Sequence, residues 1–337
     1  MTYLEEHYNE IFKKYTDEEL CKDIQSFQQG DGNLNKTLSH FFKEAIYKSA
    51  GKKADLSPWE ALSDEETVNK IISYIKSKPK FFTSNNEISN VESALRNSFS
   101  WCRKVANFPP KEARNIYFRY YNINKKPINC LDTSMGFGSR MSAVLLSGHN
   151  YCGFDPNKQL FRKIKEYKLF LKNNNFITSN QRCGLYNQGS EIFKPELTEL
   201  FDVSFTSPPY FNLEKYSNDE GASSRNYNNY QLWVKEFVIP TVENTYRYLK
   251  HGGYAMINIK NLNKKETCFD DFFAAFAIPF SLNQSTAALI SPLHSVRAFL
   301  QSIIPAPVFS LNSFTNAAVI IFTPLNYSSF LTSAATT

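Results

Sequence analysis

The sequence is poor in the residues that build metal centres. It contains only six cysteines and five histidines in 337 residues. The cysteines are scattered without a Cys-x-x-Cys pair, and the histidines do not cluster. Zinc and iron–sulfur sites need closely spaced ligands, so we predict no metal site and a reduced, cytoplasmic chain.

Long apolar runs are also missing, and we expect no secretory leader. The first ten residues, MTYLEEHYNE, are polar and acidic, unlike a secretory signal peptide. No apolar run reaches the length of a membrane span, because polar residues and prolines interrupt the apolar C-terminal region at Pro279, Asn283, Pro292 and Pro305. We therefore expect no membrane partner.

Charge is distributed unevenly along the chain. The net charge is +6, but residues 106–270 contain 22 Lys and Arg against 15 Asp and Glu. Residues 271–337 contain only two charged side chains, Asp271 and Arg297. A basic middle segment suits a polyanionic partner, although an excess of this size excludes few functions.

These shifts in composition predict three regions. Residues 1–105 are expected to form a helical accessory domain, because Thr16-x-x-Glu19 and Ser63-x-x-Glu66 are typical of capping boxes that open amphipathic helices. Residues 106–262 are expected to form the core. Residues 263–337 are an atypical, charge-poor tail that is either an apolar packing extension or the product of a frameshifted or rearranged end. A strand is expected within 312–322.

Strands and helices alternate through the core region. Five short apolar runs predict strands, at 128–131, 151–154, within 181–188, 201–206 and 254–259. Helices are expected between them, one with Pro156 in its first turn and one over 230–250 that is kinked at Pro240 and ended by Gly252 and Gly253.

This alternation is typical of an α/β fold with a doubly wound parallel sheet. Such sheets bind ligands beyond the carboxyl ends of their strands. Four polar positions follow strand ends in this sequence and should meet at that edge: Asp132, Asp155, Glu191 and Ser207.

The strand expected at 201–206 ends in the tetrapeptide Ser207-Pro208-Pro209-Tyr210. Two prolines stop a strand or a helix and hold the backbone in an extended turn. Because proline has no N–H group, the turn offers a rigid run of carbonyl groups with an aromatic ring behind it. That arrangement suits a planar group that donates hydrogen bonds, such as a base with an amino group. The plainer alternative is a proline turn after a strand.

A glycine turn, Gly136-x-Gly138, follows the first expected strand. The dinucleotide fingerprint needs a small residue three positions after the second glycine, and Met141 at that place disfavours NAD and FAD. No Lys-Ser/Thr pair follows, which excludes a P-loop. S-adenosylmethionine fits, because the glycines let the backbone approach a cofactor.

Two aspartates flank this turn. Asp132 could serve the ammonium group of S-adenosylmethionine directly or through water, and Asp155 is placed for its ribose hydroxyls. The alternatives are local: Asp132 could cap the glycine turn, and Asp155 could cap the helix that begins at Pro156.

Four stretches in chain order carry a family resemblance: LDTSMGFGS, GFDPN, GSE and TSPPYF. Together they resemble the exocyclic-amino DNA methyltransferases, which modify the amino group of cytosine or adenine, and look closest to the methylases carried by phages and mobile elements. The resemblance covers about 108–261. It departs from the commoner motif Asp-Pro-Phe-x-Gly-x-Gly, because Thr133 and Ser134 follow Asp132 here.

The resemblance implies a Rossmann-like class I core that depends on S-adenosylmethionine. The segment Phe108-Pro109-Pro110 is similar to the one that completes the cofactor pocket in that family. The cofactor-binding residues are then expected to be Phe108, Pro110, Asp132, Gly136, Gly138, Asp155 and Glu191. The catalytic residues are expected to be Ser207, Pro208, Pro209 and Tyr210.

The resemblance also implies a mechanism. The target base flips out of the stack, and its amino group donates to the carbonyl of Pro208 and to an acceptor at Ser207. Tyr210 stacks on the base, and the methyl group moves in line from sulfonium to nitrogen without a metal. In this family a serine before Pro-Pro-Tyr is associated with cytosine, which we favour over adenine.

Residues 211–229 are polar and are predicted to form a loop over the site. Residues of this loop that could contact DNA are Phe211, Glu214, Lys215, Tyr216, Arg225 and Tyr227. An ordinary solvated loop is the alternative.

Three other functions remain open at this point. The same motifs serve RNA amino methyltransferases, so RNA is not excluded as the substrate. A non-catalytic protein that keeps the fold and binds nucleic acid or a partner is the second alternative, and a dehydrogenase is the third. The resemblance also implies a role in DNA methylation of the restriction–modification kind. The sequence does not indicate the recognition site or the oligomeric state.

Overall fold

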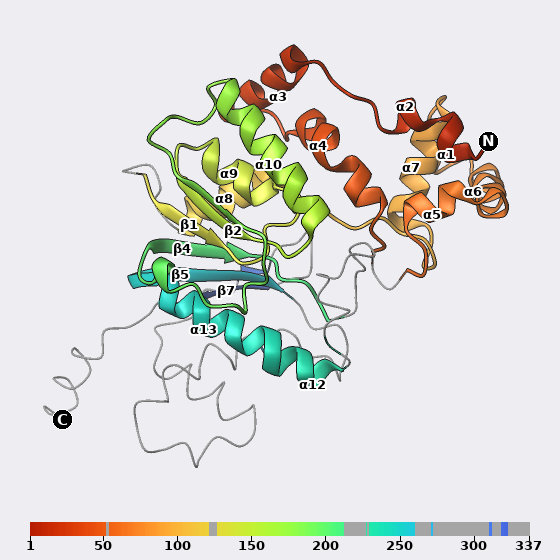
Figure 1. Cartoon of the computed structure of the whole chain (residues 1–337). Helices are drawn as coiled ribbons and strands as arrows, with labels where there is room; N and C mark the ends of the chain where they lie inside the picture. The colour runs from red at the N-terminus through yellow and green to blue at the C-terminus, as the bar shows by residue number, and fades with distance from the viewer. Residues whose placement is uncertain are drawn as a thin grey trace, which may run out of the picture.

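A seven-stranded sheet forms the centre of the computed structural model, which describes residues 1–51, 54–120, 127–211, 227, 229–259, 271, 310–311 and 318–322. Within those residues the strand order is β3-β2-β1-β4-β5-β7-β6 (Figure 1). The strands are β1 Asn129–Asp132, β2 Asn150–Phe154, β3 Cys183–Tyr186, β4 Phe201–Thr206, β5 Leu249–Ile259, β6 Ser310–Leu311 and β7 Ala318–Phe322. All five strands expected in the core region are present.

The strands from β3 to β5 run parallel to their neighbours. Because β1 lies between β2 and β4, the chain winds outward from the middle of the sheet in both directions, which is the doubly wound arrangement. The predicted α/β, Rossmann-like fold is confirmed by this order.

The charge-poor C-terminal region also contributes to the sheet. β7 pairs antiparallel with β5, and β6 pairs antiparallel with β7. The strand expected within 312–322 is confirmed over Ala318–Phe322, whereas 312–317 lie outside the described residues. The boundary predicted at residue 262 stays a prediction.

Helices cover both faces of the sheet (Figure 1). One face carries α8 Pro110–Tyr120, α9 Ser139–Leu145 and α10 Lys158–Asn173. The other carries α12 Tyr230–Trp233, a π-helical turn Val234–Val238 and α13 Ile239–Tyr248. A short 3-10 helix, Pro195–Leu197, precedes β4.

Consecutive strand residues are buried against opposite helix layers. Cys130 and Met256 belong to the hydrophobic cluster under α8–α10, whereas Leu131 and Ile257 belong to the cluster under α12 and α13. This burial on both sides explains why the strands read as continuous apolar runs rather than as alternating patterns.

The N-terminal region is helical, as expected. It contains α1 Tyr3–Glu6, α2 Tyr8–Ile11, α3 Asp17–Gln29, α4 Asn35–Tyr47, α5 Pro58–Ser63, α6 Glu65–Ser77 and α7 Glu87–Asn97. Its helices belong to two packing units. Ile24, Phe27 and Phe42 of α3 and α4 share one cluster with α9 and α10 of the core, while Leu62 and Ile71 belong to a separate cluster. The boundary predicted at residue 105 stays a prediction.

The first of the two predicted capping boxes is confirmed. Thr16 accepts from the Glu19 amide, and the Glu19 side chain accepts from the Thr16 amide. The second prediction is wrong: Ser63 is the last residue of α5, and Asp64 caps α6 by accepting from the Thr67 amide at 2.8 Å. The carboxylate takes the place of the serine hydroxyl as N-cap.

The ends of two other helices also differ from expectation. α10 begins at Lys158 with Asn157 as its cap, so Pro156 lies before the helix rather than in its first turn. α13 ends at Tyr248 and passes directly into β5, so Gly252 and Gly253 lie inside a strand and do not cap the helix. The irregularity expected at Pro240 is a π-helical turn just before it, where the missing proline N–H cannot continue the regular ladder.

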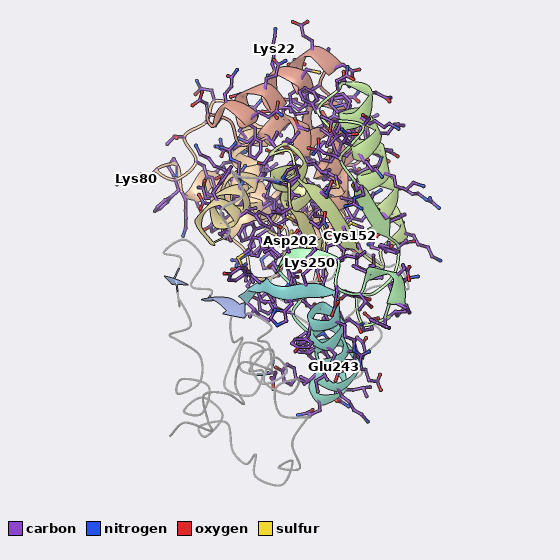
Figure 2. All side chains as sticks on the ribbon, turned by 90° about the vertical axis from the view of Figure 1, so that its left-hand side faces the viewer. Lys22, Lys80, Cys152, Asp202, Glu243 and Lys250 are labelled. Atoms are coloured by element: carbon purple, nitrogen blue, oxygen red, sulfur yellow. The ribbon has the colours of Figure 1, made fainter. Side chains whose placement is uncertain are left out.

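The two glycines instead form a bulge between β4 and β5. Phe201 pairs with Leu249, and Val203 pairs with Tyr254, so β5 contains extra residues at this point. Gly252 has a positive φ of 74°, which a residue with a side chain rarely adopts. Nearby, Lys250 forms an ion pair with Asp202 at 2.8 Å (Figure 2), and Asp202 also accepts from the Asn129 amide. These contacts fix the amino-terminal ends of β1, β4 and β5 together.

Within the part of the chain that the structure describes, no helix has the length and apolar character needed to cross a membrane.

Candidate functional site

The carboxyl ends of four parallel strands bring the predicted site residues to one edge of the sheet. Asp132 at the end of β1 is paired in register with Gly153 of β2, and Leu131 is paired with Ser204 of β4. Asp155 and Ser207 therefore follow strand ends on either side of Asp132. Glu191 follows β3 after a short turn. The predicted grouping at this edge agrees with the strand register.

Asp132 is the centre of a buried polar network. Its side chain is 0% exposed and forms an ion pair with Arg140, which is 5% exposed. Arg140 Nε lies 2.8 Å from Oδ2, and Nη2 lies 3.2 Å from Oδ1. The Tyr151 hydroxyl donates to Oδ2 at 3.0 Å, and the Ser134 amide donates to Oδ1 at 3.1 Å.

This network changes the interpretation of Asp132. Each carboxylate oxygen of Asp132 already accepts two hydrogen bonds. A direct contact with a cofactor would therefore require the ion pair between Asp132 and Arg140 to open. Burial and the adjacent Asp132 carboxylate raise the pKa of Tyr151, which keeps its hydroxyl protonated as a donor. Arg140 also donates to the Ser134 carbonyl, so the pair holds the start of the glycine turn in place.

Glycine stands at positions 136 and 138 of the turn for different structural reasons. Both have positive φ, 52° at Gly136 and 73° at Gly138. A Cβ at Gly138 would lie 3.1 Å from the Phe42 ring of α4, so this glycine is required for packing against the N-terminal helices. Among the described residues, a Cβ at Gly136 would meet only the Ser134 carbonyl, at 3.9 Å, so these residues leave open space beside Gly136.

Asp155 lies beside this open space and is partly buried. Its Oδ2 accepts from the Gly136 amide at 3.2 Å, and its Oδ1 accepts from the Asn157 amide at 2.9 Å. Burial raises the pKa of Asp155 to about 7, and the two amide donors oppose that rise. Asp155 does not cap α10, because Asn157 does. It connects the end of β2 to the glycine turn.

Glu191 is held at the same edge by α13. The Asn244 side-chain amide donates to the carbonyls of Ser190 and Glu191 at 2.9 and 3.0 Å, and the hydroxyls of Ser190 and Thr241 lie 3.0 Å apart. The Glu191 carboxylate folds over Gly189, where a Cβ would lie 2.1 Å from Oε2. That oxygen is buried without a hydrogen-bond partner in the described chain, and burial raises the pKa of Glu191.

Three buried hydroxyls next to these strand ends also lack a partner among the described residues. They belong to Thr133 directly after β1, Ser139 at the start of α9 and Thr206 at the end of β4. Buried polar groups are normally paired, so unpartnered hydroxyls at a ligand-binding edge are positions where a ligand can supply the missing hydrogen bond.

The Ser-Pro-Pro-Tyr turn follows β4 and is anchored to β5. The Ser207 hydroxyl donates to the Asn258 carbonyl at 3.4 Å and accepts from the Asn258 side-chain amide at 3.3 Å. Pro208 is buried, and Pro209 and Tyr210 are partly buried. The Pro208 carbonyl has no hydrogen-bond donor among the described residues.

Phe108, Pro110 and Phe211 lie around this turn as packing residues. The Phe108 ring meets the Phe205 ring edge-on at 5.5 Å, and Pro110 is buried at the start of α8. Phe211 contacts Tyr230 and Trp233 of α12, with ring centroids 5.8 and 6.2 Å apart. Of the predicted substrate contacts, Glu214, Lys215, Tyr216 and Arg225 lie outside the described residues. Tyr227 is 8% exposed and packs beside Phe237, with ring centroids 6.3 Å apart, so it is a core residue rather than a surface contact.

Sequence reasoning missed several residues that shape this site, above all Arg140, Tyr151 and Asn258. One signal was available for Arg140. It is the second residue of a fully buried helix that follows a glycine turn, and a buried cation in such a place needs a carboxylate partner nearby. Asn258 lies within an apolar strand and gives a weaker signal.

In comparisons with known proteins, no protein-family model and no curated protein matches the chain. Among solved structures it is similar to an S-adenosylmethionine-dependent O-methyltransferase from Thermotoga maritima, with 12% identity over 66% of this chain and 68% of that chain and a TM-score of 0.38. It is also similar to a Pyrococcus horikoshii protein, with 13% identity over 75% and 98% of the two chains and a TM-score of 0.36.

A third similar structure is tRNA (m1A58) methyltransferase TrmI from Aquifex aeolicus, with 15% identity over 48% of this chain and 51% of that chain and a TM-score of 0.32. Scores and identities of this size do not support an inference about activity. The function has to be inferred from the chain's own residues. In the described part of the chain, no three His, Cys, Asp or Glu side chains gather in a way that could hold a metal ion.

Proposed function

We propose that the chain transfers a methyl group from S-adenosylmethionine to the exocyclic amino group of a base in DNA, with cytosine favoured over adenine. The observation that carries this proposal is the position of the Ser-Pro-Pro-Tyr turn. It lies at the same sheet edge as the open glycine turn and Asp155, and its Pro208 carbonyl accepts no hydrogen bond from the described residues.

The residues at this edge fit S-adenosylmethionine. The open space at Gly136 admits a ligand next to the backbone, and the Asp155 carboxylate can accept from ribose hydroxyls. The buried Glu191 oxygen and the unpartnered hydroxyl of Thr133 offer further hydrogen bonds. When bound, the cofactor supplies an electrophilic methyl group on its sulfonium. Asp132 acts through Arg140 and Ser134, by holding the turn.

The Ser-Pro-Pro-Tyr turn acts on the base. The Pro208 carbonyl accepts from the amino group, and Ser207, held by Asn258, accepts the second hydrogen. Two acceptors placed this way favour a tetrahedral nitrogen whose lone pair is not shared with the ring. As the N–CH3 bond formed, the S–CH3 bond of the cofactor would break and leave a thioether, and the nitrogen would release one proton to water. The Tyr210 ring stacks on the base. Because the turn is rigid before the substrate arrives, little ordering remains to be done at the moment of transfer.

The direct test is methyl transfer from labelled S-adenosylmethionine to duplex DNA, single-stranded DNA and structured RNA. The nucleic acid is then digested to nucleosides, which are separated by chromatography and identified by mass spectrometry. Labelled N4-methylcytosine from DNA is the expected product, and N6-methyladenine would move the assignment to adenine. Labelled RNA alone would assign the substrate to RNA, and cofactor binding without transfer to any of the three would favour a non-catalytic binding protein.

The raised pKa of Asp155 gives a prediction about cofactor binding. The ionised carboxylate is the form that accepts from ribose hydroxyls, and with a pKa of about 7 it becomes protonated as the pH falls below 7. We therefore expect the affinity for S-adenosylmethionine to be constant above pH 8 and to weaken by up to about tenfold per pH unit well below 7. Calorimetry between pH 5.5 and 8.5 measures this dependence.

Asp155→Asn is the control for ionisation, because the amide keeps the shape and cannot ionise. Its NH2 group cannot accept, so one of the two bonds from the Gly136 and Asn157 amides is also lost. We expect this variant to bind more weakly at pH 8 and to show a flat profile. A wild-type profile that is flat from pH 5.5 to 8.5 would remove Asp155 from the cofactor site.

A further inference from the structure

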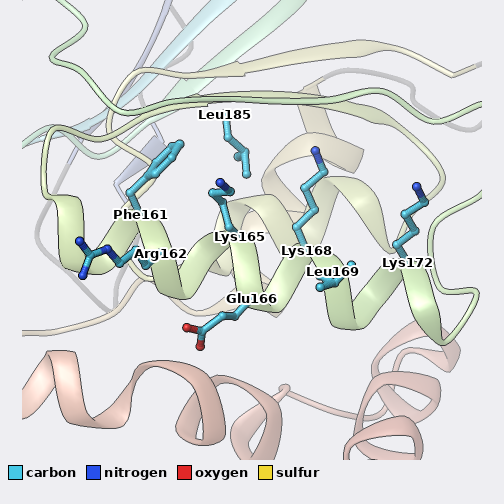
Figure 3. Close-up of a pocket in the computed structure, with 8 residues that line it drawn as sticks. All are labelled: Phe161, Arg162, Lys165, Glu166, Lys168, Leu169, Lys172 and Leu185. Atoms are coloured by element: carbon cyan, nitrogen blue, oxygen red, sulfur yellow. The ribbon is translucent and has the colours of Figure 1, made fainter.

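A basic groove runs along the outer side of α10. It is an open cavity of about 700 Å³ against the edge strand β3 (Figure 3). Seven of its eight lining residues belong to α10, and Leu185 comes from β3. The charged residues that line it are Arg162, Lys165, Glu166, Lys168 and Lys172.

Most of these cations are available to a partner. Glu166, the single carboxylate in the lining, is paired with Lys163 at 2.8 Å. Lys168 donates to the Cys183 carbonyl at 2.7 Å and ties α10 to β3. Arg162, Lys165 and Lys172 form no ion pair or side-chain hydrogen bond with the described residues.

The helix also explains the charge of the middle of the chain. Residues 158–173 contain six Lys and Arg against one Glu, a net charge of +5, within a 106–270 segment whose excess is +7. This helix therefore concentrates most of the segment's positive charge, and the groove gathers four of its six cations.

The spacing of the four cations matches a polyanion with a regular repeat. Arg162, Lys165, Lys168 and Lys172 follow one another at intervals of three, three and four residues, so they lie along one face of the helix. At ~1.5 Å per residue the row is about 15 Å long, the axial length of about four phosphates on one strand of a duplex. Figure 3 shows Arg162 at one end of the row and Lys172 at the other.

The row begins near the ligand-binding edge of the sheet. α10 follows Asp155 and begins with the cap Asn157, so Arg162 is the cation of the row nearest the ligand-binding edge. A nucleic acid strand leaving that edge can pass along the helix. Phe161 and Leu185 line the groove with Leu169, which is 57% exposed, and provide apolar surface for sugars and for the aliphatic parts of the lysines.

We propose that this groove binds the sugar–phosphate backbone of the nucleic acid whose base enters the Ser-Pro-Pro-Tyr site. The inference rests on the proposed function and adds a surface to it, at a distance from the chemistry. Contacts of this kind position the strand without reading its sequence.

The test is a triple variant, Arg162→Gln, Lys165→Gln and Lys172→Gln, which leaves Lys168 and its bond to β3 intact. The matched control, called the α6 control, removes three exposed lysines, two from α6 and one from its C-cap: Lys70→Gln, Lys76→Gln and Lys78→Gln. Both variants lose the same charge. Binding of a fluorescent 30-base-pair duplex and of a structured RNA is measured by anisotropy between 50 and 200 mM salt.

We expect the groove variant to bind the duplex at least about tenfold more weakly at 50 mM salt. The slope of log K against log salt is negative, and its magnitude should decrease by about 2 to 3. Each lost phosphate contact reduces that magnitude by about 0.9. Calorimetry with S-adenosylmethionine should give wild-type affinity for both variants. In methyl transfer the groove variant should show a higher KM for the nucleic acid and an unchanged kcat.

Three results would overturn the inference: an unchanged salt slope, an equal loss in the α6 control, or competition by polyglutamate as strong as competition by DNA of the same charge. Because anisotropy needs no turnover, the two proposals fail separately. Reduced binding in the groove variant without any methyl transfer would support the groove and reject the activity. Normal methyl transfer by the groove variant, with an unchanged KM, would support the activity and reject the groove.

Discussion

Replacing Tyr210 with alanine is expected to reduce methyl transfer by about a hundredfold or more while leaving S-adenosylmethionine binding within about twofold of wild type. Loss of an aromatic ring that stacks on a base costs about 1–3 kcal/mol, and misplacement of the amino group adds to that loss. Pro208→Ala should have a similar effect, because alanine frees the backbone that holds the accepting carbonyl. Single-turnover transfer and calorimetry measure the two quantities separately.

Tyr210→Phe is the matched control for this result. It keeps the ring and removes only the hydroxyl, so most of the transfer activity should remain. Turnover by Pro208→Ala at the wild-type rate would contradict the role given to the Ser-Pro-Pro-Tyr turn. Equal loss of cofactor binding in Tyr210→Ala would indicate a structural effect instead.

Arg140→Met is expected to lower the free energy of unfolding by about 3–5 kcal/mol. The substitution leaves the Asp132 carboxylate, which is 0% exposed, without its counter-charge in the interior. Urea denaturation followed by circular dichroism gives the free energy. The double variant Asp132→Asn with Arg140→Met removes both charges and should recover a large part of the loss.

This pair of variants separates an ion-pair effect from general damage to packing. If the double variant is as unstable as Arg140→Met, the methionine side chain is the cause and the buried charge is not. A change below about 1 kcal/mol in the single variant would mean that water reaches Asp132 when Arg140 is absent, because surface pairs contribute about that much.

The positions of the strand ends could be predicted from the sequence because each strand is a short apolar run followed by a polar residue. Burial on both faces of a parallel sheet produces such runs, and the parallel direction then brings their ends together. Asp155 and Ser207 were found in this way. The first four expected strands agree with β1–β4 to within a few residues, and the fifth lies inside the longer β5.

Contacts between distant segments could not be predicted in this way. A sequence pattern shows that Gly138 lies in a turn, but not that Phe42 from an N-terminal helix occupies the space of its missing side chain. Arg140 would ordinarily be placed on an exposed helix face, because arginine is rarely buried without a partner. Its burial depends on the register of β1 against β2, which brings Asp132 and Tyr151 together.

The contact between Phe42 and the glycine turn makes the core dependent on the N-terminal helices. α4 lies in the N-terminal region by sequence, yet it supports the turn where a cofactor would bind. A fragment that begins after residue 105 would keep the whole parallel sheet. It would lose Phe42, which packs against Gly138. The N-terminal helices therefore cannot be exchanged between proteins as an independent unit without also disturbing the glycine turn.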